Sequence, residues 1–567
     1  KTPAGETVFD LGQNMVGWVR LKVRGPRGTS VKLRHAEVLD QDGNFYTDNL
    51  RSAAAATEYI LKGNGEEIYE PYFTFQGFRY VSLEGYPGEP GLDAVRGIVI
   101  HSDMPATGSF ETSNELINRL QQNIVWGQKG NFLDVPTDTP ARDERLGWTG
   151  DAQAFAPTAA FNFNVAGFFA KWLKDLEADQ KANGSVPYVV PDVLSHNQVG
   201  GGGSAGWADA ATIIPWTMYL AYADTRILER QYESMRKWVG FMRDQAGEDL
   251  IWNSGFHFGD WLAFATTQSD YPGATTDKDL IATAFFAHST DLLSRTAGVL
   301  GKADDERAYR NLFEDVKAAF NREYVTETGR LASNTQTAYA LALEFDLIPD
   351  ELRVEAGRRL AEDVNRFGHL TTGFLGTPHL ADALTNMGYL DEAYKLLLRE
   401  KYPSWLYPVT QGATTMWERW DGIKPDGTFQ DVGMNSFNHY AYGAIGNWMY
   451  RVLAGLNLDP AEPGYKHTII HPRPGGNFAM ARASLNSMYG EVASGWTVEG
   501  GRLEVTVTVP PNTTATVRLP EARLQDVTES GGAVGSAVGV ANAYQDGEDV
   551  VVEIGSGEYQ FSQNWGR

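Results

Sequence analysis

The hydrophobic pattern of this chain changes its period twice, and that order of patterns limits the fold more than any other feature. Residues 1–104 alternate apolar and polar side chains, as in "TVFDLGQNMVGWVRLKVRG", which predicts short β-strands. Residues 105–455 carry apolar side chains at helical spacing, and residues 456–567 return to alternation. We therefore expect three domains with these bounds: an N-terminal β-sandwich, a helical domain and a C-terminal β-sandwich.

The helical part contains about a dozen candidate helices when apolar residues at helical spacing are counted. That number, taken as consecutive pairs, fits an (α/α)6 toroid, in which outer helices surround inner ones and the loops at one end form a cup. At 567 residues the chain also exceeds what one hydrophobic core usually serves. The predicted fold class is a multidomain chain in which an all-α (α/α)6 toroid is flanked by antiparallel β-sandwich domains.

Composition excludes several classes of function. The formal net charge of −24 argues against nucleic acid and anionic membranes as partners, because both require basic patches. No apolar run approaches the roughly 20 residues that span a bilayer. No leader peptide is visible, so we expect a soluble protein, with a cytoplasmic location favoured. The absence of Cys removes disulfides, thiol nucleophiles and thiolate metal sites.

Acidic residues beside tryptophan recur in the connections of the helical part. The stretch "DTPARDERLGWTGD" holds four carboxylates, two arginines and Trp148. A second stretch, "WERWD", places Glu418 between two tryptophans, the first of which is Trp417. In "GDWL" and "GWADA", acids lie next to Trp261 and Trp207. Each such pairing costs desolvation energy unless the carboxylate is used or satisfied.

Glycoside hydrolysis needs this set of groups. One carboxylic acid protonates the leaving oxygen, and one carboxylate activates water or attacks the sugar. A carboxyl group enclosed by aromatic rings and close to a second carboxyl has a raised pKa, which suits a proton donor. Glu144, within "RDER", and Glu418 are the candidate pair. The structural alternative is a network of arginines and carboxylates that ties loops together.

Histidine gives no metal signature. None of the ten histidines forms an HExxH motif or a comparable cluster, so we expect neither a metal ion nor a cofactor. His439 begins the apolar segment "HYAYGAIGNW", where a buried structural role and a hydrogen bond to substrate are both open.

Six segments together resemble the bacterial α-L-rhamnosidases of glycoside hydrolase family 78. They are "DTPARDERLGWTGDAQ", "GWADAATIIPW", "GDWL", "HLTTGFLGTP", "GATTMWERWDG" and "SFNHYAYGAIGNWMY". The flanking β-regions resemble those of the same family, in "YFTFQGFRYVSLEGY" and "YKHTIIHPRPGG". One departure is "DTPAR", where family members often have "DCPQR"; it leaves the acids unchanged.

The resemblance implies an inverting hydrolase that releases terminal, non-reducing α-L-rhamnose. It assigns the general acid to Glu144 and the general base, which deprotonates water, to Glu418. It implies that four residues bind hydroxyl groups of the sugar, namely Asp138, Arg142, Asp151 and His439. It implies that Trp148, Trp207 and Trp261 face the C6 methyl group. Trp417, beside the base, is a further candidate for substrate binding. The expected partners are small or oligomeric rhamnosides.

Two other functions stay open from the sequence. The first is a polysaccharide lyase on the same toroid, although an acid-rich cup would repel its uronate substrates. The second is a non-catalytic carbohydrate-binding protein. Because both glutamates are present, nothing in the sequence favours this function. The oligomeric state is also open, with a homodimer as one expectation.

Overall fold

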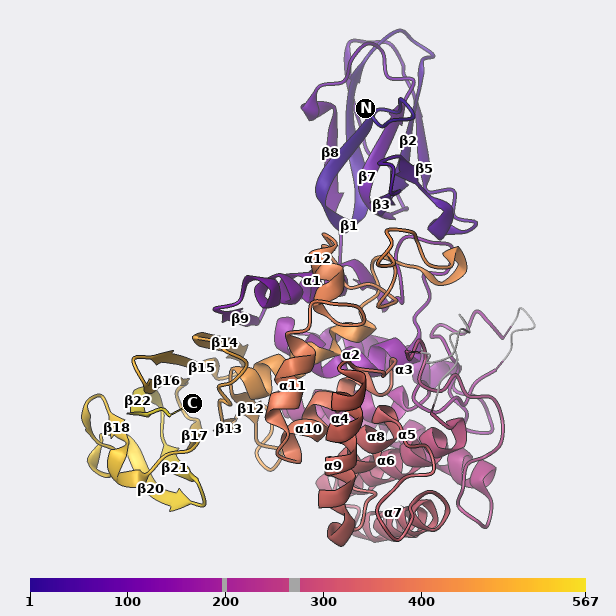
Figure 1. Ribbon diagram of the computed structural model, residues 1–567. Helices are drawn as coiled ribbons and strands as arrows, with labels where there is room; N and C mark the ends of the chain where they lie inside the picture. Colours follow the sequence, from indigo (N-terminus) through magenta and orange to yellow (C-terminus); the bar gives the residue numbers. More distant parts are fainter. Residues whose placement is uncertain (196–200, 265–275, 567) are drawn as a thin grey trace. The chain divides into compact units, whose positions relative to one another are not determined.

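The computed structural model describes residues 1–195, 201–264 and 276–566. In it, a helical region is flanked in sequence by an N-terminal and a C-terminal β-region, which confirms the predicted class (Figure 1). The chain forms two compact units. Unit 1 comprises residues 1–103, 119–151 and 400–443, and unit 2 comprises residues 104–118, 152–399 and 444–567. The bounds of the three predicted domains stay a prediction.

The N-terminal β-region, which belongs to unit 1, is built on a six-stranded antiparallel sheet of order β5-β2-β7-β1-β6, in which β8 also pairs with β1. Its strands are β1 (Val8–Arg24), β2 (Ser30–Ala36), β5 (Ala56–Ile60), β6 (Glu66–Tyr69), β7 (Gln76–Glu84) and β8 (Val95–Val99), beside the hairpin of β3 (Val38–Leu39) and β4 (Phe45–Tyr46). The apolar positions predicted from the alternation, such as Val19, Leu21 and Leu33, are buried.

Gly17 permits the close pairing of β1 with β8. It has a φ of 155°, and a Cβ there would lie 1.8 Å from the carbonyl oxygen of Ile98. Any other residue would push these strands apart.

The helices follow in hairpins. They are α1 (Glu115–Asn131), α2 (Thr149–Asn162), α3 (Ala166–Asp179), α4 (Ala210–Tyr222), α5 (Thr225–Ala246), α6 (Lys278–Val299), α7 (Ala303–Tyr324), α8 (Gln336–Glu344), α9 (Asp350–Phe367), α10 (Thr377–Asn386), α11 (Leu390–Leu397), α12 (Leu406–Thr410) and α13 (Ile445–Trp448). All but α1, α2 and α12 lie wholly in unit 2. Short strands β10 (Phe132–Leu133) and β11 (Val135–Pro136) follow α1.

Burial alternates along this series, as expected for inner and outer rings. Helix α6 is buried on nearly every side, and α8 is buried over most of its length. The intervening α7 buries one face, which includes Phe313, Val316 and Phe320, and exposes acids in its first turn. The first turn of α6 is capped by Asp277, whose side chain accepts hydrogen bonds from the backbone of Asp279 and Leu280.

The C-terminal β-region, in unit 2, contains two sheets. One has the order β12-β13-β17-β21-β20 and the other β19-β18-β22-β16-β15-β14-β9. Their strands are β9 (Gly108–Thr112), β12 (Leu456–Leu458), β13 (His467–Ile470), β14 (Met480–Ser487), β15 (Gly490–Glu499), β16 (Arg502–Val509), β17 (Thr514–Leu519), β18 (Thr528–Glu529), β19 (Gly532–Ala533), β20 (Val540–Asp546), β21 (Asp549–Ile554) and β22 (Gly557–Asn564).

Two details of these sheets differ from a simple antiparallel sandwich. Strand β13 pairs with β17 in parallel. Strand β9, which precedes the helices in sequence, pairs with β14 and completes the edge of the seven-stranded sheet. No helix in the described ranges combines the length and apolarity that a membrane span requires.

Candidate functional site

The segment from Asp138 to Trp148 folds into a compact loop in unit 1. The Asp138 backbone N–H donates to the carbonyl of Leu146, and the Leu146 N–H donates to the Asp138 carboxylate at 3.0 Å. Ala141 packs against β7 at Gly77, where a Cβ would lie 2.9 Å from the Ala141 nitrogen. The loop is therefore held from both sides, which fixes Arg142 at its centre.

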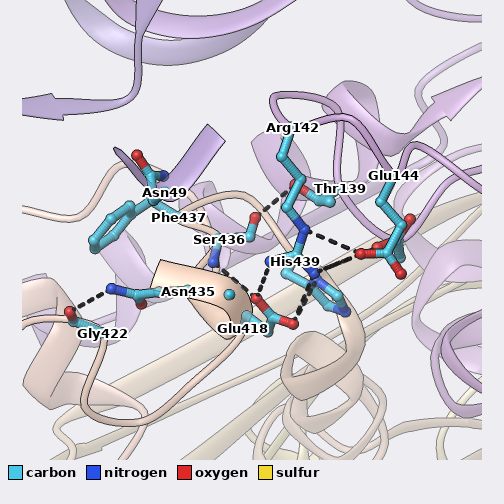
Figure 2. Close-up of polar contacts among 12 residues, drawn as sticks. Asn49, Thr139, Arg142, Glu144, Glu418, Gly422, Asn435, Ser436, Phe437 and His439 are labelled. Carbon is cyan, nitrogen blue, oxygen red and sulfur yellow. Dashed lines mark hydrogen bonds and ion pairs between the residues drawn. The ribbon is translucent and has the colours of Figure 1, made fainter. Parts of the chain in front are cut away.

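Arg142 joins the two predicted glutamates (Figure 2). Its guanidinium donates to both carboxylate oxygens of Glu418, at 2.8 and 3.0 Å, and its Nη2 lies 2.9 Å from Glu144 Oε2. Arg142 and Glu418 are almost fully buried, whereas the Glu144 side chain keeps 17 % exposure. Residues that are remote in sequence thus share one cation.

Glu418 is held as an anion. Burial alone would raise its pKa, but the Arg142 charge, His439 and a 2.8 Å hydrogen bond from the Ser436 backbone lower the pKa of Glu418 to about 2. The Glu418 N–H donates in turn to the Ser436 carbonyl, and the Ser436 hydroxyl lies 2.6 Å from that of Thr139. The base candidate is thus fixed by main chain as well as by charge.

Glu144 receives hydrogen bonds from three side chains. Besides Arg142, the indole N–H of Trp148 donates to Oε1 at 2.8 Å, and Arg51 donates to Oε2 at 3.0 Å. Arg51 also binds Asp143, with an N···O distance of 2.6 Å. The acid candidate therefore has a defined orientation.

His439 forms a short ion pair with Asp151. The Nε2–Oδ1 distance is 2.6 Å, and Nδ1 lies 4.0 Å from Glu418 Oε1. Burial would lower the pKa of His439, but Asp151 and then Glu418 raise it to about 9, so the ring is protonated at neutral pH. The isolated sequence left its role open; the structure places it among the acids.

The pKa of Asp138 is raised well above its ordinary value. Burial is the main cause, and the neighbouring Glu144 adds to it. Arg142 lies 3.8 Å from Asp138, which opposes the rise. The loop therefore supplies a group that favours its proton beside an ionised Glu418.

The tryptophan candidates divide between the units. Trp148 lies in unit 1 on Glu144. Trp417 is buried in a hydrophobic cluster with Ala413 and Phe437, whose ring it meets edge-on at 5.2 Å. Its indole therefore supports the peptide next to Glu418.

In unit 2, Trp207 and Trp261 each contact Phe258, at centroid distances of 4.7 and 5.7 Å. Asp260 beside them is satisfied within the fold, because it accepts hydrogen bonds from the backbone of Gly373 and its neighbours and from a threonine. Asp260 therefore has a structural role. Trp207 and Trp261 thus form an aromatic group of their own.

Two groups in the site, Arg51 and Glu37, were not predicted from the sequence. Arg51 lies in "DNLRSAAA", which carries no motif, and it adopts a φ of 55°. Glu37, also in unit 1, is buried and accepts the Phe437 N–H at 3.2 Å. Both act across large sequence separations, so no local pattern could have identified them.

Among the described residues, no three His, Asp or Glu side chains form a set that could hold a metal ion. The acids of unit 1 are instead balanced by Arg142, Arg51 and His439. Arg142 thus holds two carboxyl groups, the buried and ionised Glu418 and the more exposed Glu144. Such a pair can supply the general base and the general acid of one reaction.

Sequence profiles of one family cover most of the chain. Residues 105–453 match the bacterial alpha-L-rhamnosidase 6 hairpin glycosidase domain. Residues 1–101 match the bacterial alpha-L-rhamnosidase concanavalin-like domain, and residues 455–534 match the C-terminal domain of the same family.

Individual relatives agree with the profiles. An alpha-L-rhamnosidase of Streptomyces avermitilis is 48% identical over 559 residues, which are 98% of this chain and 52% of that protein. An alpha-L-rhamnosidase of Formosa agariphila is 46% identical over 522 residues, or 91% of this chain and 55% of that protein. The chain thus spans about half the length of these curated relatives.

Solved structures show the same relationship. The Streptomyces avermitilis alpha-L-rhamnosidase complexed with L-rhamnose superimposes with a TM-score of 0.92 at 47% identity, covering 99% of this chain and 52% of that one. The alpha-L-rhamnosidase of Dictyoglumus thermophilum gives a TM-score of 0.91 at 37% identity, covering all of this chain and 62% of its own.

Proposed function

The chain belongs to the bacterial α-L-rhamnosidase family, and from this premise we propose that it hydrolyses terminal α-L-rhamnosides with inversion at the anomeric carbon. The observation that carries the proposal is the bridging of Glu144 and Glu418 by Arg142, because it gathers the two carboxyl groups that glycoside hydrolysis needs. We also propose the domain bounds 1–104, 105–455 and 456–567.

In the proposed reaction, Glu144 gives its proton to the glycosidic oxygen as the bond to the anomeric carbon breaks. Water attacks that carbon from the opposite face, and Glu418 takes the proton that the water loses. The exposure of Glu144 suits contact with a leaving group that faces solvent, and the burial of Glu418 suits a single confined water. Inverting enzymes hold the two carboxyl groups about 6.5–9.5 Å apart to make room for this water.

Arg142 changes its partners in this proposal. With a pKa of about 2, Glu418 is a weak base while the guanidinium holds both of its oxygens. Hydroxyl groups of a bound rhamnose compete for Arg142, which frees an oxygen of Glu418 and raises its basicity. Substrate binding thereby activates the base.

The sugar itself is proposed to be L-rhamnose, the ligand in the Streptomyces avermitilis structure. Asp138, Asp151, Arg142 and His439 offer hydrogen-bond acceptors and donors for its ring hydroxyls. Its C6 methyl needs an apolar surface, for which Trp148 is the candidate within unit 1 and the pair Trp207 and Trp261 the candidate within unit 2; Trp417 supports the base from its buried cluster.

The test compares Glu144→Gln and Glu418→Gln with Glu177→Gln, a control on an exposed position of α3. On an aryl α-L-rhamnoside, kcat of both site variants should fall by about 10²- to 10⁴-fold, while the control stays at the wild-type value. Proton NMR of the first product should show β-rhamnose. Initial α-product, or a double bond absorbing in the ultraviolet, would refute inverting hydrolysis.

A further inference from the structure

Unit 2 contains a cavity of about 420 Å³ that none of the proposed sugar-binding residues lines. Residues of α2, α4, α6, α8 and α10 line it on the helical side, and four residues at the start of the C-terminal β-region, Asn457, Leu458, Pro460 and Tyr465, line it on the other. Ligand pockets in proteins usually measure about 300–1,000 Å³, so this space suits a small molecule.

Two imidazoles face the cavity without a hydrogen-bond partner among the described residues. His288 stacks on Phe345 with a centroid distance of 4.0 Å, and His379 meets the same ring edge-on at 4.9 Å. Burial lowers the pKa of His288 to about 3 and that of His379 to about 4. Both rings are therefore neutral, and each offers one N–H donor and one nitrogen acceptor.

The remaining polar groups nearly cancel in charge. Asp382 is paired with Arg451 at 2.5 Å, and Arg451 also donates to Asn447 at 3.1 Å. Glu344 accepts a hydrogen bond from Asn386 at 2.9 Å, and burial together with the charge of Asp382 raises the pKa of Glu344 to about 7. An anion would meet two carboxyl groups and an arginine that is already paired.

The cavity also has an apolar part of its lining, here called the apolar wall. Phe161, Ile213 and Leu220 line the cavity, as do Pro157 and Pro378. A hydrocarbon ligand would leave the two imidazoles without hydrogen-bond partners, which is costly inside a protein. A molecule with many hydroxyls satisfies both kinds of surface, because each hydroxyl donates and accepts while its C–H groups pack on the apolar side.

We propose that this cavity is a second binding site, which takes a neutral polyhydroxylated molecule of about the size of a monosaccharide. His288, His379 and Glu344 recognise its hydroxyls, and the apolar wall receives its carbon skeleton. The ligand would also tie the helices to residues 457–465. The proposal does not rest on the hydrolase activity.

The experiment uses the full chain with histidine labelled by ¹⁵N, so that imidazole signals report where a ligand binds. The probes are L-rhamnose, D-glucose, D-galactose and myo-inositol, with citrate as an anionic comparison. The variants His288→Phe and His379→Phe assign the two cavity signals and remove their polar contacts. The control is His467→Phe, at a histidine on β13 outside the cavity.

At least one neutral probe should shift the His288 and His379 signals and raise the Tm of the wild type and of His467→Phe. Each cavity variant should weaken binding about tenfold or more, the loss of one or two hydrogen bonds, with turnover of an aryl rhamnoside unchanged. If either variant fails to fold, electron density in wild-type crystals soaked with the probe decides. Three results would overturn the proposal. The first is that no probe shifts the His288 and His379 signals and the soaked crystals show no density in the cavity. The others are that only citrate binds there, or that neither substitution changes the binding of the probe.

Discussion

Arg142 donates two hydrogen bonds to Glu418, from Nη1 to Oε2 at 2.8 Å and from Nη2 to Oε1 at 3.0 Å, although the residues belong to loops that are far apart in the sequence. Both side chains are at most 2 % exposed. A paired arrangement of this kind fixes orientation as well as charge. Among the groups that lower the pKa of Glu418, the proposed base, the charge of Arg142 has the largest effect.

We predict that Arg142→Lys moves the acidic limb of the pH profile of kcat/KM to higher pH. Lysine cannot form the same two-pronged contact, so the Glu418 anion loses stabilisation and its pKa rises from about 2. At neutral pH we expect kcat/KM to fall by about 10- to 100-fold, the loss of about 1.4–2.7 kcal/mol.

The matched control for this prediction is Arg79→Lys, which alters the more exposed Arg79–Asp10 pair of the N-terminal sheet. Its pH profile should equal that of the wild type. An unchanged acidic limb in Arg142→Lys would show that Arg142 does not set the ionisation of the group that limits activity at low pH.

Arg51 should orient the proposed acid. It contacts Glu144 and Asp143, and its removal leaves Glu144 with only the contacts from Arg142 and Trp148 to hold its orientation. Arg51→Ala should therefore lower kcat several-fold for rhamnosides with alkyl leaving groups, which need full protonation, and less for p-nitrophenyl rhamnoside. The comparison variant is Arg34→Ala, which breaks ion pairs with Glu6 and Glu84 in the N-terminal sheet. Equal losses on the two substrates would contradict an effect through Glu144.

Periodicity and short motifs predicted a large part of this protein. The alternation in residues 1–104 predicted the strands, because one face of a sheet must be buried, and the acid-rich stretches pointed to Glu144 and Glu418. Arg51 and Glu37 could not be predicted, since a contact between distant segments depends on how the whole unit packs. The pairing of β9 with β14 was missed for the same reason.

The ion pair of His439 and Asp151 should make stability fall at alkaline pH. The pKa of His439 is about 9 in the folded chain against 6.5 for the free side chain. Its contribution is therefore complete below pH 6.5 and is lost as pH rises through 9, with a size on the order of 3 kcal/mol. Thermal melting followed between pH 6 and pH 10 should show this fall in the wild type and a smaller one in His439→Asn. Parallel curves would mean that another group is responsible.

Glu37 should stabilise unit 1 and, through it, the position of Glu418. Its carboxylate accepts hydrogen bonds from Asn14 and Asn49, each at 3.0 Å, and from the N–H of Phe437. Phe437 follows Ser436, whose N–H binds Glu418, and Figure 2 shows Asn49 and Phe437 beside this segment.

Glu37→Ala leaves these buried donors without an acceptor, which should cost about 3 kcal/mol of folding free energy. A merely structural role would lower Tm and leave kcat of the remaining folded enzyme unchanged. We expect kcat, measured well below the melting transition, to fall as well, because the Ser436 N–H shifts away from Glu418. Glu37→Gln keeps an acceptor oxygen and should recover part of both losses. A normal kcat in folded Glu37→Ala would contradict this prediction, because it would show that Glu37 stabilises the N-terminal β-region without affecting the chemistry at Glu418.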